Sequence, residues 1–196
     1  TVSRWYYLDN SGSYASFGTV SRQPILATSG TVETVNGKIA LKYIQGSATT
    51  MTLFAQVSAV ENWTSCIVAK RASSGQRILG ICGGFYAYSI IQDTDNVFYI
   101  RSRSGYIASS ADTGTAQMIA VTTMAGSTRE MRKNGAAVTT SYTSSTNSAN
   151  FKEAGSWDDA GYYGSFHVQS MILWSSDRSG NSSDIETVQN EYYGIY

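Results

Sequence analysis

The amino-acid sequence predicts an all-β fold, an antiparallel two-sheet β-sandwich that ends in one short C-terminal helix. Three observations lead to this prediction. Apolar and polar residues alternate over short segments, as they do in strands that bury one face. Such segments recur about every ten residues between turns rich in Gly, Ser and Asn, which is typical of sandwiches. A helical spacing of apolar residues occurs only near the C-terminal end.

Two Asn-Gly pairs, at positions 36–37 and 134–135, indicate tight turns between strands. Asn and Gly tolerate the positive φ angles of a type I′ turn, whose twist suits a β-hairpin. The segments that flank these turns are 32–35, 39–43, 129–132 and 137–140. Each pair of flanking segments is therefore predicted to form a hairpin.

Further segments are expected to form strands with at least one buried face. They are 51–57, 65–71, 77–82, 86–92, 97–103, 117–123 and 167–174. The short polar segments 72–76 and 93–96 are expected to join their neighbours into two more hairpins. Because no helix separates these strands, antiparallel pairing is favoured over parallel units.

One helix is expected at the C-terminal end. Ser183 and Glu186 have the spacing of a capping box, in which two side chains satisfy N–H groups of the first turn. Ile185, Val188 and Tyr192 then follow at helical intervals and form an apolar stripe. No internal repeat or linker-like segment divides the sequence, so residues 1–196 are predicted to form a single domain.

Composition excludes several classes of protein. The 14 Lys and Arg residues balance the 14 Asp and Glu residues, whereas proteins that bind nucleic acid carry an excess of positive charge. No segment approaches the roughly 18–20 apolar residues that a membrane-spanning helix needs. Hydrophobic residues make up 42% of the chain, which is more than a disordered protein contains. The sequence therefore indicates a folded domain that neither binds nucleic acid nor inserts into a membrane.

Several short motifs occur in a characteristic order along nearly the whole chain. They are the segment Trp-Tyr-Tyr-Leu-Asp-Asn-Ser-Gly at 5–12, then 22–26 with 36–41, then 129–135, and finally 161–164, 171–174 and 184–196. In this order they resemble the laminin-G-like, concanavalin A-like jelly roll, particularly the versions found in phage tail and other virion proteins. The resemblance implies a jelly-roll sandwich that binds carbohydrate or a receptor, on a virion surface or outside the cell.

Two departures from the family pattern concern acidic positions. Tyr7 stands where the family has the first Asp of a Trp-Tyr-Asp motif, and residues 43–46 replace a Phe-Asp-Gly stretch. A related branch of the family includes arabinofuranosidases, and glycoside hydrolases of the usual kind need two carboxylates across the scissile bond. The remaining acids fall mostly in turns, and the single histidine, His167, lies outside any nucleophile motif. We therefore expect no enzymatic activity.

Candidate ligand-binding residues are aromatic side chains with polar neighbours in loops, because flat rings can stack on a sugar face while polar groups bind its hydroxyls. The main cluster lies in a Gly-rich loop and contains Trp157, Asp158, Asp159, Tyr162 and Tyr163. The competing interpretation is that these rings pack under the loop or against a neighbouring subunit.

Three further residues, Asn62, Trp63 and Tyr106, are candidates of the same kind. Trp63 follows Asn62 between two predicted strands, so this ring and amide are expected in a connecting loop. Tyr106 follows a Ser-Gly pair and is also expected near a loop. A surface position would let each ring contact a ligand.

The turn with Asp93, Asp95 and Asn96 carries oxygen ligands of the kind that calcium prefers. A turn this short supplies fewer than the roughly six to eight ligands that calcium takes, and the EF-hand pattern is absent. We expect no cofactor; calcium at this turn is the alternative, since laminin-G-like domains bind calcium at the sandwich rim. One histidine and two cysteines exclude a zinc site.

The two cysteines, Cys66 and Cys82, lie in the segments predicted to pair as a hairpin around Ser74. Equal spacing from this centre would set them opposite each other, where a cross-strand disulfide is strained but able to form. The alternative, two buried free thiols, is favoured.

Three functions remain in order of preference. The first is a non-enzymatic carbohydrate- or receptor-binding domain of a phage tail or virion surface protein, whose partners are a cell-surface glycan or polysaccharide and other virion proteins. The second is a structural decoration or oligomerisation module, such as a homotrimer, that binds no glycan. The third is a glycoside hydrolase related to the arabinofuranosidases.

Overall fold

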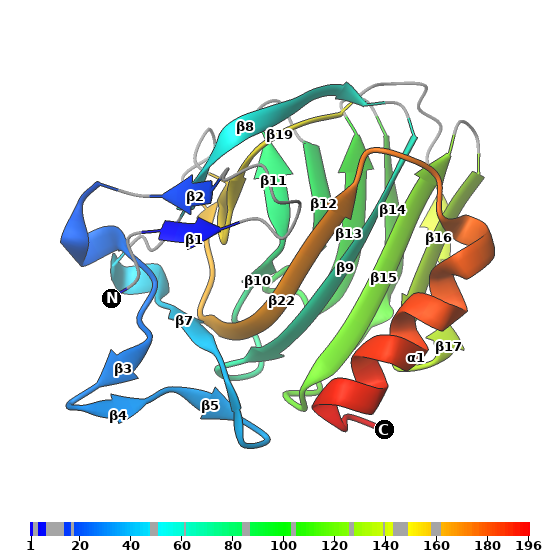
Figure 1. Ribbon diagram of the computed structural model, residues 1–196. Coiled ribbons are helices and arrows are strands. Elements are labelled where there is room, and N and C mark those ends of the chain that lie inside the picture. Colours follow the sequence, from blue (N-terminus) through cyan, green and yellow to red (C-terminus); the bar gives the residue numbers. More distant parts are fainter. Residues whose placement is uncertain are drawn as a thin grey trace.

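The computed structural model describes residues 1, 4–6, 14–16, 18–47, 51–60, 62–83, 87–102, 105–125, 128–138, 140–142, 149–157 and 162–196. Its strands form a larger and a smaller antiparallel sheet that face each other, with a C-terminal helix against the smaller sheet (Figure 1). The predicted antiparallel β-sandwich with one short C-terminal helix is confirmed.

The larger sheet contains β1 (Arg4–Tyr6), β2 (Tyr14–Ser16), β8 (Met51–Val60), β10 (Ile78–Leu79), β11 (Ile81–Gly83), β12 (Ala87–Gln92), β13 (Val97–Ser102), β14 (Gly105–Ala111), β18 (Thr140–Tyr142) and β19 (Ala149–Ala154). Its strand order is β1-β2-β8-β19-β11-β12-β13-β14-β18, and β10 also pairs with β12.

The smaller sheet contains β7 (Leu41–Tyr43), β9 (Asn62–Arg71), β15 (Met118–Ala125), β16 (Thr128–Lys133), β17 (Ala136–Ala137) and β22 (Phe166–Trp174), in the order β17-β16-β15-β9-β22-β7. Short hairpins are formed by β3 (Ala27–Thr28) with β4 (Thr31–Val32), β5 (Thr34–Val35) with β6 (Lys38–Ile39), and β20 (Ser156–Trp157) with β21 (Tyr162–Tyr163). Among the described residues, the 3₁₀ turns η1 (Val20–Arg22), η2 (Gln45–Ser47) and η4 (Ser179–Asn181) lie in connections.

The two Asn-Gly turns form as predicted. Asn36 and Gly37 have φ angles of 47° and 71°, and Asn134 and Gly135 have φ angles of 49° and 81°, so both residues of each turn are in the positive region that type I′ turns require. They connect β5 to β6 and β16 to β17. The predicted hairpin across residues 93–96 also forms, between β12 and β13.

Aromatic side chains fill the space between the sheets. The rings of Trp63 and Phe151 meet edge to face at 5.3 Å, and those of Tyr43 and Phe166 stack at 4.8 Å. The prediction that Trp63 contacts a ligand from a loop is therefore wrong. Strand β8 ends at Val60 and β9 begins at Asn62, which makes Trp63 the second residue of a strand. Its side chain is 0% exposed.

The two cysteines lie in different sheets. Cys66 belongs to β9, which pairs with β15 and β22, whereas Cys82 belongs to β11, which pairs with β12 and β19. The predicted hairpin of segments 65–71 and 77–82 is wrong, because the chain crosses from one sheet to the other between them. Both thiols are free and buried, as favoured. Burial raises the pKa of Cys66 to about 12, so little reactive thiolate forms at neutral pH.

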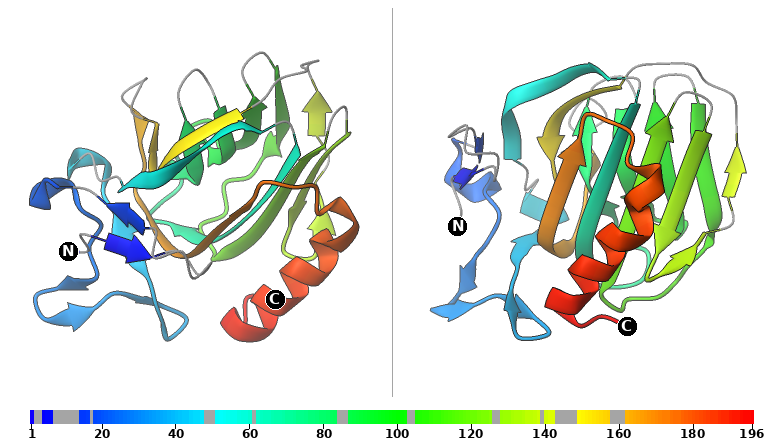
Figure 2. Two further views of the ribbon diagram at one scale, coloured as in Figure 1. Left: turned by 45° about the horizontal axis from the view of Figure 1, so that its top comes forward. Right: turned by 45° about the vertical axis from the view of Figure 1, so that its right-hand side comes forward.

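The helix α1 (Ser182–Tyr193) lies across the outer face of the smaller sheet (Figure 2). Its N-cap is Asn181, without a side-chain hydrogen bond, so the predicted capping box is wrong. Glu186 is instead fully buried against the sheet. The predicted apolar stripe is only partly right, because Ile185 packs against the sheet while Val188 and Tyr192 are exposed.

An ion pair holds α1 to the hairpin of β16 and β17. Arg132 donates from Nε to Glu186 Oε2 at 2.7 Å, and the Gly135 N–H donates to Glu186 Oε1 at 3.1 Å. Arg132 also donates from Nη2 to the Gly135 carbonyl at 2.9 Å. Both oxygens of the buried carboxylate are therefore satisfied, as its burial requires.

No helix among the residues that the structure describes is long and apolar enough to cross a membrane.

Glu33 ties the short N-terminal hairpins to the edge of the smaller sheet. It accepts a hydrogen bond from the Thr28 hydroxyl, and its carboxylate lies 3.3 Å from His167 Nε2 and 3.6 Å from Lys42 Nζ. The pKa of Glu33 is lowered, mainly by the hydrogen bond from Thr28. Burial acts in the opposite direction, but the Thr28 bond together with the nearby His167 and Lys42 outweighs it.

We expect the Glu33→Gln variant to unfold more easily than the original chain at about pH 7, by up to about 1 kcal/mol, because the pair is partly solvated. A lowered pKa favours the charged form in the folded state, so this stabilisation is present above the ordinary value of 4.5 and is lost as the pH falls through the folded pKa. Urea unfolding at about pH 7 and about pH 3 measures the difference. An equal difference at both pH values would contradict the expectation, and the exposed Glu191→Gln is the control.

Candidate functional site

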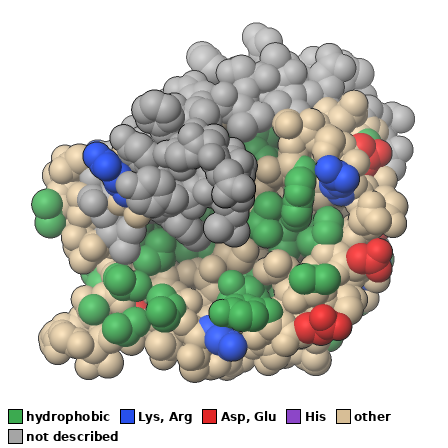
Figure 3. All heavy atoms as spheres, in the orientation of Figure 1, with side chains coloured by type: hydrophobic (Ala, Val, Ile, Leu, Met, Phe, Trp, Pro, Cys, Tyr) green, Lys and Arg blue, Asp and Glu red, His purple; other side chains and the backbone are tan. Residues whose placement is uncertain are grey.

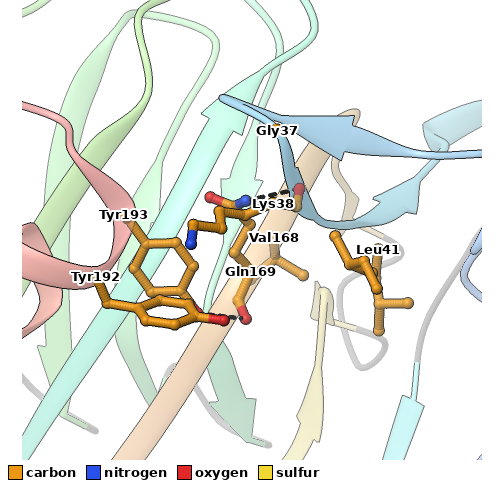
Figure 4. Close-up of a pocket in the computed structure, with 8 residues that line it drawn as sticks. Gly37, Lys38, Leu41, Val168, Gln169, Tyr192 and Tyr193 are labelled. Atoms are coloured by element: carbon orange, nitrogen blue, oxygen red, sulfur yellow. Dashed lines mark hydrogen bonds between the residues drawn. The ribbon is translucent and has the colours of Figure 1, made fainter.

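A groove of about 450 Å³ lies between the β5–β6 hairpin and the C-terminal end of α1 (Figure 4). Strand β22 crosses its floor. The residues that line it are Gly37, Lys38, Ile39, Leu41, Val168, Gln169, Tyr192 and Tyr193. They come from the N-terminal hairpins, the smaller sheet and the helix, so the groove exists only in the folded chain.

A bulge in β22 places Gln169 at the centre of this groove. Val168 pairs with Ala69 and Ser170 with Val68, so Gln169 is an extra residue without a partner in β9. Its amide donates to the carbonyls of Val35 at 2.9 Å and of Lys38 at 3.0 Å. These bonds fix both ends of the hairpin turn against the strand.

The helix is tied to the same strand and hairpin. The Tyr193 hydroxyl donates to the Gln169 carbonyl at 3.2 Å. Gly194 ends the helix with a φ of 62°, the left-handed conformation that glycine adopts most easily. Asn36 donates from Nδ2 to the Gly194 carbonyl at 3.5 Å. The walls of the groove are therefore held in place before any ligand binds.

An aromatic ring and a basic group face the opening. Tyr192 is 61% exposed, and its ring meets Tyr193 edge to face at 4.8 Å. Lys38 Nζ lies 4.3 Å from the centre of the Tyr192 ring. Ile39 on the rim is 64% exposed. On the face drawn in Figure 3, hydrophobic side chains gather in the lower half with a basic side chain among them.

The cluster predicted from the sequence lies elsewhere, on the β20–β21 hairpin. Its register sets Trp157 opposite Tyr162, so these two residues are paired on adjacent strands. Tyr163 is half-buried, and its hydroxyl accepts a hydrogen bond from Arg22 Nη2 at 3.0 Å. Two members of the cluster, Asp158 and Asp159, lie outside the described residues. A ligand at this hairpin stays a prediction.

The candidates outside this hairpin are not brought together. Asn62 is exposed at the start of β9, but the adjacent Trp63 ring points into the core, so no joint site forms. Tyr106 is the second residue of β14 and pairs with Arg101. Tyr106 therefore lies at the start of a strand, and a ligand contact there stays a prediction.

The turn considered for calcium is occupied by protein donors. Asp93 accepts from Arg77 Nε at 2.6 Å, and Asn96 accepts from Arg71 Nη1 at 2.7 Å. Asp95 accepts from a backbone N–H at 2.9 Å and from a tyrosine hydroxyl at 2.6 Å. Two guanidinium groups beside these oxygens disfavour a cation. Within the described ranges, no three His, Cys, Asp or Glu residues group as metal ligands.

Sequence reasoning misses the groove, since Lys38 and Tyr192 come from distant segments that only tertiary packing brings together. The available signals are an Asn-Gly turn followed by lysine and two adjacent tyrosines at a helix end. Neither pattern is specific for binding without the other.

Comparisons with known proteins show what the fold is similar to. Neither a protein-family model nor a curated protein sequence matches this chain. Among solved structures, the binding domain of Paraclostridial Mosquitocidal Protein 1 has a TM-score of 0.60 and 11% identity, over 94% of this chain and 49% of that one. The receptor binding domain of botulinum neurotoxin type G has a TM-score of 0.55 and 10% identity, over 91% of this chain and 47% of that one.

Trypanosoma rangeli sialidase in complex with the inhibitor DANA has a TM-score of 0.55 and 14% identity, over 91% of this chain. This chain spans 29% of the sialidase chain, and about half of the mosquitocidal-protein and neurotoxin chains. Identities this low establish the fold alone. They agree with the topology in showing an antiparallel jelly-roll β-sandwich.

Proposed function

We propose that this chain is a carbohydrate-binding domain that acts by adhesion, without catalysis, and that the groove beside α1 is its binding site. The observation that carries the proposal is the exposed Tyr192 ring in a groove of about 450 Å³ whose walls are fixed by hydrogen bonds. A tyrosine ring presents an apolar face and a hydroxyl, which matches the alternating CH and OH groups of a sugar. A preformed site loses less entropy on binding than a flexible one.

The proposed partner is a cell-surface glycan or polysaccharide, and the proposed location is extracellular, on a phage tail or other virion surface. The order of motifs along the chain supports the virion context. Two structures with the same fold are described as the binding domain of a mosquitocidal protein and the receptor binding domain of a neurotoxin, which supports adhesion. A single groove of this size binds weakly, so we propose that copies in an oligomer, such as a trimer, raise the avidity.

The groove also favours binding over hydrolysis. Hydrolysis of the usual kind needs two carboxyl groups across the glycosidic bond. The described residues that line the groove include no aspartate or glutamate. We therefore expect no release of reducing sugar from a bound polysaccharide. Release that disappears in Asp158→Asn or Asp159→Asn would instead identify a hydrolase.

Tyr192→Ala is expected to weaken glycan binding about tenfold or more, because it removes the main ring surface of the groove. The test is a glycan array probed with multimerised protein, followed by affinity measurement on each glycan that binds. Val188→Ala is the matched control, since this residue is exposed on the same helix but does not line the groove.

Trp157→Ala distinguishes the groove from the β20–β21 hairpin. If Trp157→Ala loses glycan binding while Tyr192→Ala binds as tightly as the original chain, the glycan binds at the hairpin. The groove is then not the binding site. If multimerised protein binds no glycan at all, the adhesion proposal is wrong and a structural module is the better description.

A further inference from the structure

We propose that the groove selects acidic saccharides, and that Lys38 binds the carboxylate or sulfate group of the sugar. This inference rests on the proposed carbohydrate-binding function and adds the chemical class of ligand. The inference starts from the charge of the groove. Among the described residues that line it, Lys38 carries a positive charge and none carries a carboxylate.

Lys38 differs in this respect from four basic residues that have carboxylate partners. Ion pairs join Lys42 to Glu33, Arg77 to Asp93, Arg132 to Glu186 and Lys133 to Asp112. Within the described part of the chain, Lys38 Nζ has no carboxylate within ion-pair distance and lies over the ring of Tyr192 instead.

The contact between Lys38 and Tyr192 can be exchanged for a ligand. A cation over an exposed ring is held weakly, and an anionic group bonds to an ammonium more strongly than a ring does. With Lys38 in place, Tyr192 is still 61% exposed. One sugar can therefore place its anionic group on Lys38 and its ring against the remaining surface of Tyr192.

The backbone fixes where Lys38 can reach. Its carbonyl accepts from Gln169 Nε2 at 3.0 Å, and the preceding Gly37 has a φ of 71° in the tight turn. The neighbouring Asn36 is bonded to the end of α1. Lys38 is thus anchored at the rim of the groove, with its ammonium on the helix side. This placement gives specificity to the site, unlike a lysine on an unattached loop.

The test compares charged and neutral polysaccharides with the same backbone. The probes are polygalacturonate against its fully methyl-esterified form, and dextran sulfate against dextran, each titrated into the protein of 196 residues. We expect at least one charged probe to bind about tenfold tighter than its neutral partner, as a charge-assisted hydrogen bond implies. The two pairs distinguish a carboxylate ligand from a sulfate ligand.

Lys38→Gln is expected to abolish this charge preference, so that the charged and the neutral probe of a pair bind this variant with equal affinity. Arg178→Gln is the control, because it removes one exposed positive charge before the start of α1, away from the groove. If Lys38→Gln and Arg178→Gln lose the same amount of affinity for the charged probe, the preference comes from non-specific attraction between charges, and the inference is overturned.

Failure of the inference is distinguishable from failure of the proposed function. If charged and neutral probes bind equally, and Tyr192→Ala weakens both while Lys38→Gln weakens neither, the groove binds glycans but does not select acidic ones. If neither pair of probes nor any arrayed glycan binds, both proposals are wrong. Thermal unfolding of each variant confirms that the folded state is retained.

Discussion

Gly155→Ala is expected to lower the free energy of unfolding by about 3 kcal/mol or more, a large fraction of the stability of a domain. Gly155 follows β19 with a φ of 82°, a conformation that costs residues with a Cβ atom about 1–3 kcal/mol. The added Cβ would also overlap the ring of Tyr43. That ring is buried and stacks on Phe166 at 4.8 Å, so it has little room to move away.

Urea unfolding followed by tryptophan fluorescence measures this loss. Gly46→Ala is the control, because Gly46 is exposed, has no positive φ and has no atom within 4 Å of the added Cβ. We expect the control to change stability by less than about 0.5 kcal/mol. A Gly155→Ala variant as stable as this control would show that the Tyr43 ring does not pack on Gly155.

Glu186→Ala is expected to destabilise the chain by about 2–4 kcal/mol, because breaking a buried ion pair leaves an uncompensated charge. The Glu186 side chain is 1% exposed and its partner Arg132 is 16% exposed, so water reaches the guanidinium only in part. The Gly135 N–H loses its acceptor as well. Since these bonds attach α1 to the β16–β17 hairpin, the helix should detach before the sheets unfold.

Hydrogen exchange of backbone amides tests this order of events. In Glu186→Ala, the amides of α1 should lose protection while those of β9 and β15 keep it. Glu191→Ala, at an exposed position of the same helix, is the control. If α1 stays as protected as in the original chain, the ion pair does not hold the helix. A detached helix would also carry Tyr192 away from the groove and weaken glycan binding.

The sequence suffices for features that depend on a few adjacent residues. Both Asn-Gly hairpins are predictable because few other residues adopt positive φ at two successive positions. The C-terminal helix is predictable from its apolar spacing, although its cap is not. Ser183 and Glu186 match a local pattern, but Glu186 binds Arg132 from a distant strand, and no local pattern reveals such a partner.

The sequence misleads where the chain changes sheets. Cys66 and Cys82 have the spacing of a hairpin, yet β9 and β11 pair with other strands in opposite sheets. Trp63 is misplaced for a related reason, since β8 and β9 leave almost no loop between them. The groove is missed because Lys38 and Tyr192 meet only after the whole fold has formed.

Strand β22 fills the place between β9 and β7, two strands that the ribosome synthesises much earlier. Until residues 166–174 have left the exit tunnel, both of these strands have an unpaired edge, which exposes a nascent chain to aggregation. Pairing over such long sequence separations also slows folding. The smaller sheet should therefore close only once β22 has been synthesised, and production should improve when chaperones shield the growing chain.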